Sequence, residues 1–217
     1  MRKQEKENSS GAMKYILLGA VALGLLGAGI YISSKPEPAP SGQKVAVSPG
    51  RLPGLQTGEV PWPAEIENLR ERLHLMGLPA LQEEGFAVHI HQHLEVFIHG
   101  KAVDVPAAIG FNPMARFISP IHTHDGSGII HIESPTPTTL TLGQFMDVWG
   151  VRFTASCIGG YCADQKNSLK LFVNGAVKEG DPRALVLTDH PVIVITYGDQ
   201  GALPVPIPAK FLFPPGT

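Results

Sequence analysis

The clearest pattern in the chain is an alternation of polar and apolar side chains over residues 87–99. His89, His91, His93 and Glu95 share one parity, whereas most of the intervening positions are aliphatic. Successive side chains of a β-strand point to opposite faces of the sheet. The pattern therefore predicts one long strand with an imidazole-rich face and an apolar face that packs on a core.

Shorter apolar runs after this strand, separated by turn residues, predict further secondary structure. Runs rich in β-branched residues are expected to be strands, at residues 102–105, 129–132, 138–141, 151–155, 169–173, 185–187 and 192–197. Apolar residues at helical spacing predict helices at residues 64–76 and 142–149, each followed by a glycine that suits the C-cap. The pair Asn174-Gly175 predicts a tight hairpin.

The order of these elements indicates the fold class. From Gly128 onward the expected order is strand, strand, helix, strand, short strand and strand, which is typical of a β-grasp arrangement. We therefore expect one α+β domain at residues 64–200, mostly antiparallel, with a β-grasp-like C-terminal half. A Pro-rich C-terminal tail at residues 201–217 is expected to lie across the domain or to dock on a partner.

The N-terminal sixty residues differ in composition from the rest. Residues 15–32 carry no charged side chain and would form roughly 27 Å of helix, close to the hydrocarbon thickness of a bilayer. We expect a single transmembrane helix there, after a cytoplasmic tail at residues 1–14 that carries basic side chains. A Pro-rich linker at residues 33–63 would follow and hold a periplasmic or extracellular domain. A cleaved signal peptide is the alternative for the apolar segment.

Partners are suggested by two features. Ala20, Gly24 and Ala28 form a ridge of small residues on the expected membrane helix, and such ridges let helices approach closely. Together with the apolar tail, this ridge favours an alternative role as an accessory subunit of a membrane complex. The formal net charge of −2, without a basic run interleaved with aromatic residues, argues against nucleic acid as a partner.

The two cysteines, Cys157 and Cys162, enclose the sequence Ile-Gly-Gly-Tyr. This spacing suits a disulfide that clamps a loop in an oxidising compartment. A redox pair or a pair of metal thiolates is the alternative, although the spacing differs from the two-residue spacing typical of those sites.

Candidate chemistry comes from histidine, because seven of the nine histidines lie between residues 89 and 131. Histidines at alternate strand positions are about 6–7 Å apart on one face, so pairs on neighbouring strands could surround one ion. We predict a metal site formed by His89, His91, His93, His122, His124 and His131, with Glu95, Asp125 and Glu133 as candidate carboxylate partners. The alternative is a solvated strand face that binds no metal. His99 and His190 are expected to be surface residues.

The types of the candidate ligands limit which metal ions and which kinds of chemistry we expect. Imidazole suits copper, zinc, iron and nickel, and we expect copper or zinc, with iron less favoured. A closed site would store, carry or be stabilised by the ion, whereas a site with an open position could activate water. The sequence contains no nucleophile elbow, phosphate loop or His-Glu-x-x-His motif, so no catalytic residue is assigned. The spacing His89-x-His91-x-x-x-Glu95 matches the first cupin motif, but the second cupin motif is absent.

Several motifs together resemble a family of bacterial proteins that combine a membrane anchor with one exported domain. The residues that carry the likeness are His89-x-His91-x-His93-Leu94, Val105-Pro106 with Ile109-Gly110, His122-Thr123-His124-Asp125, residues 128–134, and Leu142-Gly143-Gln144-Phe145 with Trp149-Gly150-Val151. The resemblance covers residues 62–198 and implies no particular activity. The cysteine pair lies outside the shared pattern.

Overall fold

The computed structural model describes residues 51–217. No helix within this range is long and apolar enough to cross a membrane. The expected transmembrane helix at residues 15–32 lies outside the described residues.

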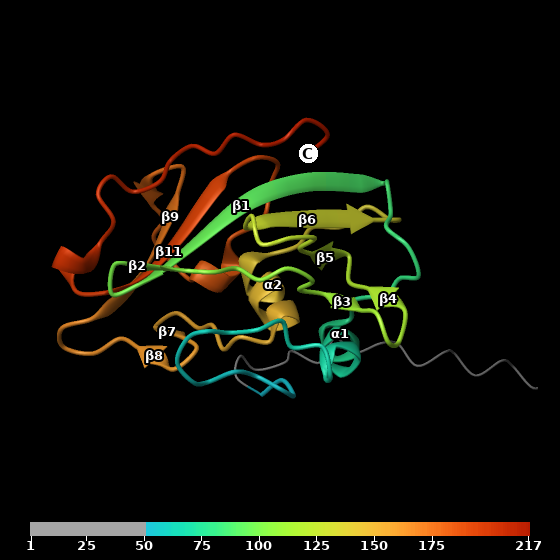
Figure 1. Cartoon of the computed structure of the whole chain (residues 1–217), viewed down its shortest axis with the longest axis horizontal. Coiled ribbons are helices and arrows are strands. Elements are labelled where there is room, and N and C mark those ends of the chain that lie inside the picture. The colour runs from blue at the N-terminus through green and yellow to red at the C-terminus, as the bar shows by residue number, and fades with distance from the viewer. Residues whose placement is uncertain (1–50) are drawn as a thin grey trace, which may run out of the picture. The chain divides into compact units, whose positions relative to one another are not determined.

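A seven-stranded mixed sheet forms the centre of the domain (Figure 1). Its strands are β1 (Val88–Ile98), β2 (Lys101–Val103), β5 (Ile121–His122), β6 (Ile129–Ser134), β9 (Ser168–Val173), β10 (Ala176–Val177) and β11 (Val192–Gly198). The order is β10-β9-β11-β1-β6-β5, and β2 pairs with β1. Only β1 and β11 run parallel, and the other pairs in this sheet are antiparallel. The expected α+β class with a mostly antiparallel sheet is confirmed.

The remaining elements are short. Two hairpins lie beside the sheet, β3 (Phe111–Asn112) with β4 (Phe117–Ile118), and β7 (Cys157–Ile158) with β8 (Tyr161–Cys162). The helices are α1 (Leu69–Met76), α2 (Leu142–Trp149) and the 3-10 turns η1 (Pro182–Ala184) and η2 (Gln200–Ala202).

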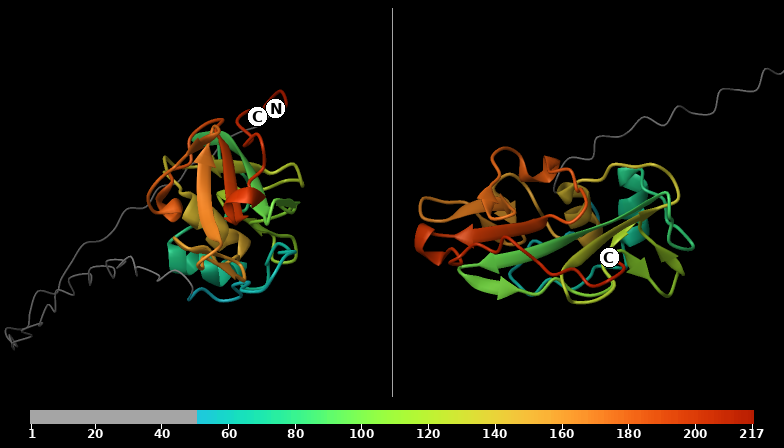
Figure 2. Two further views of the ribbon diagram at one scale, coloured as in Figure 1. Left: turned by 90° about the vertical axis from the view of Figure 1, so that its left-hand side faces the viewer. Right: turned by 90° about the horizontal axis from the view of Figure 1, so that it is seen from above.

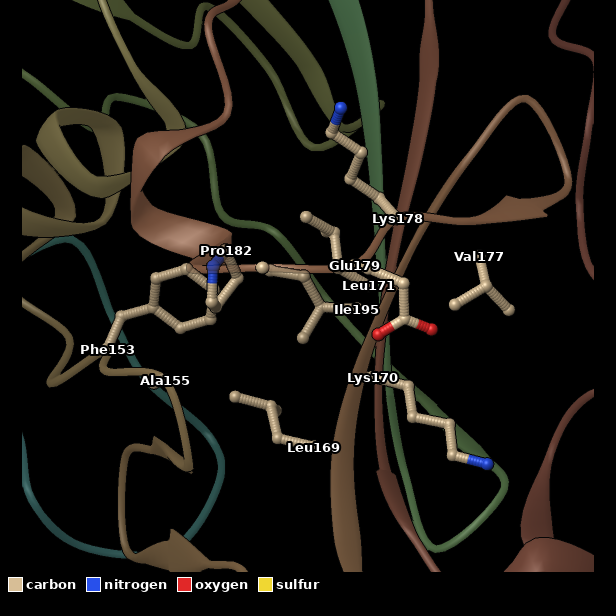
Figure 3. Close-up of a pocket in the computed structure, with 11 residues that line it drawn as sticks. Phe153, Ala155, Leu169, Lys170, Leu171, Val177, Lys178, Glu179, Pro182 and Ile195 are labelled. Carbon is tan, nitrogen blue, oxygen red and sulfur yellow. The ribbon is translucent and has the colours of Figure 1, made fainter.

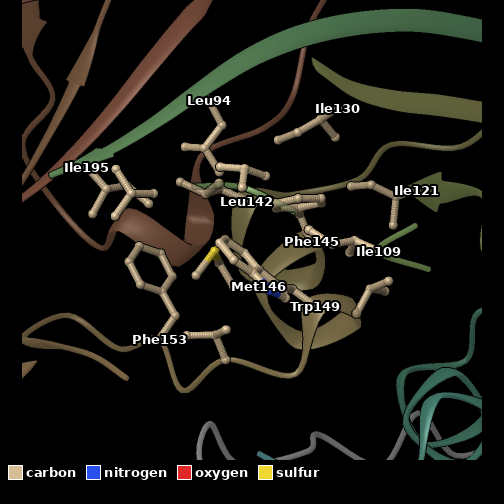
Figure 4. Close-up of a cluster of buried hydrophobic side chains, with 14 of the residues drawn as sticks. Leu94, Ile109, Ile121, Ile130, Leu142, Phe145, Met146, Trp149, Phe153 and Ile195 are labelled. Carbon is tan, nitrogen blue, oxygen red and sulfur yellow. The ribbon is translucent and has the colours of Figure 1, made fainter. Parts of the chain in front are cut away.

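Helix α2 covers one face of the sheet and carries the centre of the core (Figure 4). It begins at a capping box between Thr141 and Gln144 and spans the residues that the sequence predicts. Phe145, Met146 and Trp149 are fully buried against the apolar side chains of the sheet. Each such side chain contributes about 1.5–3 kcal/mol of hydrophobic stabilisation, so α2 fixes which face of the sheet is the core.

The long strand β1 has the two faces that its alternation predicts. Leu94, Val96 and Ile98 are buried in the core below the sheet. The residues of opposite parity, among them His91 and His93, therefore lie on the outer face. This outer face is the surface on which the histidines meet.

The segment before the domain packs more closely than the expected linker. Trp62 is buried, and its ring lies edge-on to Trp149 with 6.2 Å between centroids. The predicted helix at residues 64–76 is correct only at its C-terminal end, because α1 begins at Leu69. The preceding residues form a turn in which Glu65 accepts hydrogen bonds from Asn68 and binds Arg72.

Three predicted strands are wrong. Residues 138–141, 151–155 and 185–187 form only isolated bridges, such as the one between Thr141 and Val186. The side chain of Thr141 caps α2, which ends any extended run there. The predicted hairpin is confirmed, since Asn174 and Gly175 join β9 to β10 with φ angles of 51° and 81°.

The disulfide is confirmed. Cys157 and Cys162 are bonded and face each other across the β7–β8 pair. Neither sulfur is therefore free to act as a thiolate ligand.

The C-terminal tail crosses the outer face of the sheet, opposite α2 (Figures 1 and 2). Leu203, Ile207 and Phe211 pack on a second apolar cluster formed by Phe172, Val192 and Val194. The tail was expected either to lie across the domain or to dock on a partner, and in the structure it lies across its own domain.

Candidate metal centre

One row of histidines crosses three neighbouring strands on the outer face. His91 of β1 pairs directly with His131 of β6, and His131 pairs with His122 of β5. Directly opposed residues on one face have Cβ atoms about 4.5–5.5 Å apart, which brings their rings into contact. The ring centroids are 4.6 Å apart for His91 and His131 and 5.5 Å apart for His131 and His122.

Glu133 lies at the centre of the cluster. It is two residues after His131 on β6 and pairs directly with His89 of β1. Its Oε1 atom is 3.2 Å from His131 Nδ1 and 3.3 Å from His89 Nε2, and its Oε2 atom is 3.9 Å from His122 Nε2. His124, just after β5, completes the group with Nε2 3.2 Å from that of His122.

Four of these residues have the spacing of a metal site. His122, His124, His131 and Glu133 each offer a ligand atom, and the four atoms lie within 4.8 Å of one another. A tetrahedral zinc ion with ligands about 2.0–2.1 Å away would hold them about 3.4 Å apart. The observed separations of 3.2, 3.2, 3.9 and 3.9 Å between individual pairs bracket that value. Small side-chain movements would therefore close the group around an ion.

A hydrogen bond on the side of the ring away from the cluster fixes the orientation of His122. Its Nδ1–H donates to the carbonyl oxygen of Ser119 over 3.0 Å, which leaves the lone pair on Nε2 directed into the cluster. Such a hydrogen bond from the second ring nitrogen is the usual support of a metal-binding histidine. Gly110 packs against the same residue, since a Cβ atom there would lie 3.0 Å from His122 Cβ and 2.8 Å from the carbonyl of Ile121.

The protonation states also suit a cation. Burial lowers the pKa of His122 to about 3, which the negative charge of Glu133 only partly opposes. Burial, with the nearby His131 and His89, lowers the pKa of His91 to about 4. Burial alone would raise the pKa of Glu133, but the hydrogen bond from His131 and the surrounding imidazoles lower it to about 2. At neutral pH His91 and His122 are neutral around a charged carboxylate, and these are the forms that bind metal.

The cluster is buried at its centre and open at its ends. His122 is 0% exposed and Glu133 is 5% exposed. The side chains of His89 and His124 are each 40% exposed, so solvent reaches the cluster from both sides. Phe111 of the β3–β4 hairpin lies edge-on to His122, with centroids 5.2 Å apart, and covers its ring.

Three predicted site residues lie outside the cluster. His93 donates from Nε2 to the carbonyl of Ser127, and its ring stacks on Phe211 of the tail with centroids 3.6 Å apart. Glu95 approaches only His93, over 3.7 Å. Asp125 is exposed, and its carboxylate accepts a hydrogen bond from the backbone of Ser127 within a turn.

Two residues near the cluster, Glu84 and Asp189, were not predicted from the sequence, and His190, which is exposed as expected, also lies near it. Glu84, in the loop before β1, has Oε1 3.6 Å from His124 Nε2, and burial and the charge of Glu133 raise its pKa. Asp189 and His190, just before β11, form a further potential ligand group with His91. The parallel pairing of β1 with β11 brings them there, and no local pattern in the sequence shows that pairing.

A separate cavity of about 280 Å³ lies beside β9 (Figure 3). Its walls include Phe153, Leu169, Leu171 and Ile195. It contains no histidine or cysteine and only one carboxylate, that of Glu179. This cavity therefore offers no set of metal ligands.

The described part of the chain thus contains buried clusters of histidine and glutamate that can hold a metal ion. Comparison of the chain with models of protein families, with curated proteins and with solved structures finds no match.

Proposed function

We propose that this chain is a membrane-anchored, exported protein whose domain binds copper or zinc through His122, His124, His131 and Glu133. The observation that carries the proposal is the convergence of three imidazoles from β5, β6 and the turn between them on one buried carboxylate. The apolar segment at residues 15–32 supports the anchor, and the disulfide supports an oxidising compartment.

The ligand set favours zinc or copper over other ions. Imidazole nitrogen suits both, and carboxylate oxygen completes a four-ligand site for zinc. Thiolate chemistry is excluded for the two cysteines while they are bonded to each other. Iron sites of the facial type use two histidines and one carboxylate, so a third imidazole favours copper or zinc over iron.

The same ligand set favours holding the ion over catalysis. Four protein ligands fill a tetrahedral coordination sphere, which is the arrangement of structural zinc sites. His124, the most exposed of the four, is the ligand that an acceptor molecule would displace first. We therefore propose metal storage, transfer or metal-dependent stabilisation as the role.

The proposal is tested by metal analysis of the purified full-length protein. We expect a stoichiometric amount of copper or zinc in the unmodified chain and the loss of one ion per chain in the double variant His122→Ala, His131→Ala. The variant His74→Ala removes an exposed imidazole of α1 and should retain the metal. Metal-free unmodified protein that also fails to take up either ion from solution would end the proposal.

The role as an accessory subunit of a membrane complex is a separate proposal. The tail packs on its own domain, so support for a partner comes from the small-residue ridge at residues 20–28 alone. Purification from gently solubilised membranes would test it, and a chain that runs without any stoichiometric partner would contradict it.

A further inference from the structure

We propose that the outer face of the sheet holds two metal ions, with Glu133 as the ligand that they share. The inference extends the proposed function by adding a second ion, held by His89, His91 and Glu133, beside the ion at His122, His124 and His131. The ligand atoms of His89, His91 and Glu133 lie within 4.8 Å of one another.

The two ligand groups are adjacent in the sheet. His89 and His91 occupy neighbouring positions on the outer face of β1, and their ring centroids are 4.8 Å apart. His91 in turn contacts His131 of the first group, with centroids 4.6 Å apart. One ion with four ligands would leave His89 and His91 unused next to the same charged carboxylate.

Glu133 is placed to serve both ions. A carboxylate has two oxygens with about four lone-pair sites, so it can bind two cations at once. Oε1 lies between the two groups, 3.3 Å from His89 Nε2 and 3.2 Å from His131 Nδ1, and Oε2 is 3.9 Å from His122 Nε2. In two-metal sites the ions are about 3.5–4 Å apart, a separation that a shared carboxylate supports.

Asp189 adds a second carboxylate beside the group of His89, His91 and Glu133, because its Oδ1 accepts a hydrogen bond from the backbone N–H of His91 over 3.1 Å. The two ligand groups together bring five imidazoles to Glu133. His91 is 3% exposed, so its ring is held in place within this group.

His190 is left out of the second site. Its Nδ1 atom is 2.9 Å from Asp189 Oδ2, and its Nε2 atom is 3.1 Å from the carbonyl oxygen of Thr217 in the tail. Both ring nitrogens are therefore engaged. The second ion has three protein ligands and one open position, next to the exposed side chain of His89.

Zinc titration of metal-free, full-length protein by calorimetry tests the inference. We expect two zinc ions per chain in the unmodified protein and one in His89→Ala. The side chain of His89 is 40% exposed, so its replacement leaves the core intact. The double variant His89→Ala, His91→Ala should also bind one ion, and His74→Ala should bind two.

The outcomes separate this inference from the proposed function. One zinc ion in the unmodified protein, unchanged in His89→Ala, would overturn the second site and leave the first. No zinc in any form would overturn both.

Copper(II) provides an independent readout. Two Cu(II) ions at about 4 Å couple magnetically, so we expect a broadened or weakened EPR spectrum for the unmodified protein. His89→Ala should restore the spectrum of an isolated ion. A simple single-ion spectrum at full copper loading of the unmodified protein would contradict the inference.

Discussion

The buried, neutral state of His122 makes the stability of the metal-free protein depend on pH. An unfolded histidine takes up a proton near pH 6.5, whereas burial holds the pKa of folded His122 at about 3. Above pH 6.5 both states are neutral and the group has no effect. As the pH falls below 6.5, the unfolded state gains a proton that the folded state does not bind, so folding becomes less favourable until the pH reaches the folded pKa.

The size of the effect follows from the two pKa values. Each pH unit between them costs about 1.4 kcal/mol, so moving from pH 7 to pH 5 should lower the free energy of unfolding by about 2 kcal/mol. For a domain of this size that corresponds to a fall in Tm of about 4–8 °C. His91, with its pKa lowered to about 4, acts in the same direction. Glu133 adds to the loss only at lower pH, between its ordinary value and about 2.

Thermal unfolding followed by circular dichroism, in the presence of a chelator, measures this dependence. The variant His122→Asn keeps a donor for the carbonyl of Ser119 but does not titrate, so its Tm should fall less steeply between pH 7 and pH 5. His74→Asn, on the exposed face of α1, should keep the slope of the unmodified protein. If Tm falls equally steeply with pH in the unmodified protein and in His122→Asn, the assignment of a neutral, buried imidazole is refuted.

Three further predictions concern residues around the site. Gly110→Ala should destabilise the protein by about 1–3 kcal/mol and weaken metal binding. The φ angle of Gly110 is 81°, and an added Cβ atom would press on His122. An unchanged Tm and an unchanged zinc affinity would contradict this. Cys157→Ser with Cys162→Ser should lower stability by about 2 kcal/mol but leave the metal content unchanged; loss of metal would implicate the sulfurs. Phe211→Ala removes a ring that stacks on His93 of β1, with 3.6 Å between the ring centroids. It should lower Tm and increase binding of a hydrophobic dye. Unchanged values would show that the tail does not pack there in solution.

The strands that carry strong local patterns could be predicted from the sequence. The alternation in β1 correctly separates the core face, with Leu94 and Val96, from the histidine face. The predicted helix at residues 142–149 matches α2, because its apolar spacing, capping box and terminal glycine all agree. Strands of two residues, such as β5, are too short to show any periodicity.

The arrangement of strands depends on contacts between distant residues, which the sequence does not show. The β-grasp-like half stays an interpretation. The parallel pair at the centre of the sheet uses β1, which precedes Gly128, whereas the predicted β-grasp pattern begins at Gly128. The same pairing places Asp189 beside His91, where its carboxylate accepts a hydrogen bond from the backbone N–H.

The membership of the histidine–glutamate cluster could be predicted in large part, because His-x-His pairs on paired strands share a face. His93 has the correct parity but lies at the end of the β1–β6 pairing, opposite Ile129, where the tail covers it. The central role of Glu133 comes from its position opposite His89, and that register follows from tertiary structure.

A crystal structure of the full-length protein grown with zinc, with diffraction data collected on both sides of the zinc absorption edge, tests the central claim most directly. The account predicts an anomalous peak among His122, His124, His131 and Glu133, with ligand atoms about 2.0–2.2 Å from the ion. An ordered cluster without anomalous density, while zinc binds only at the protein surface, would contradict it.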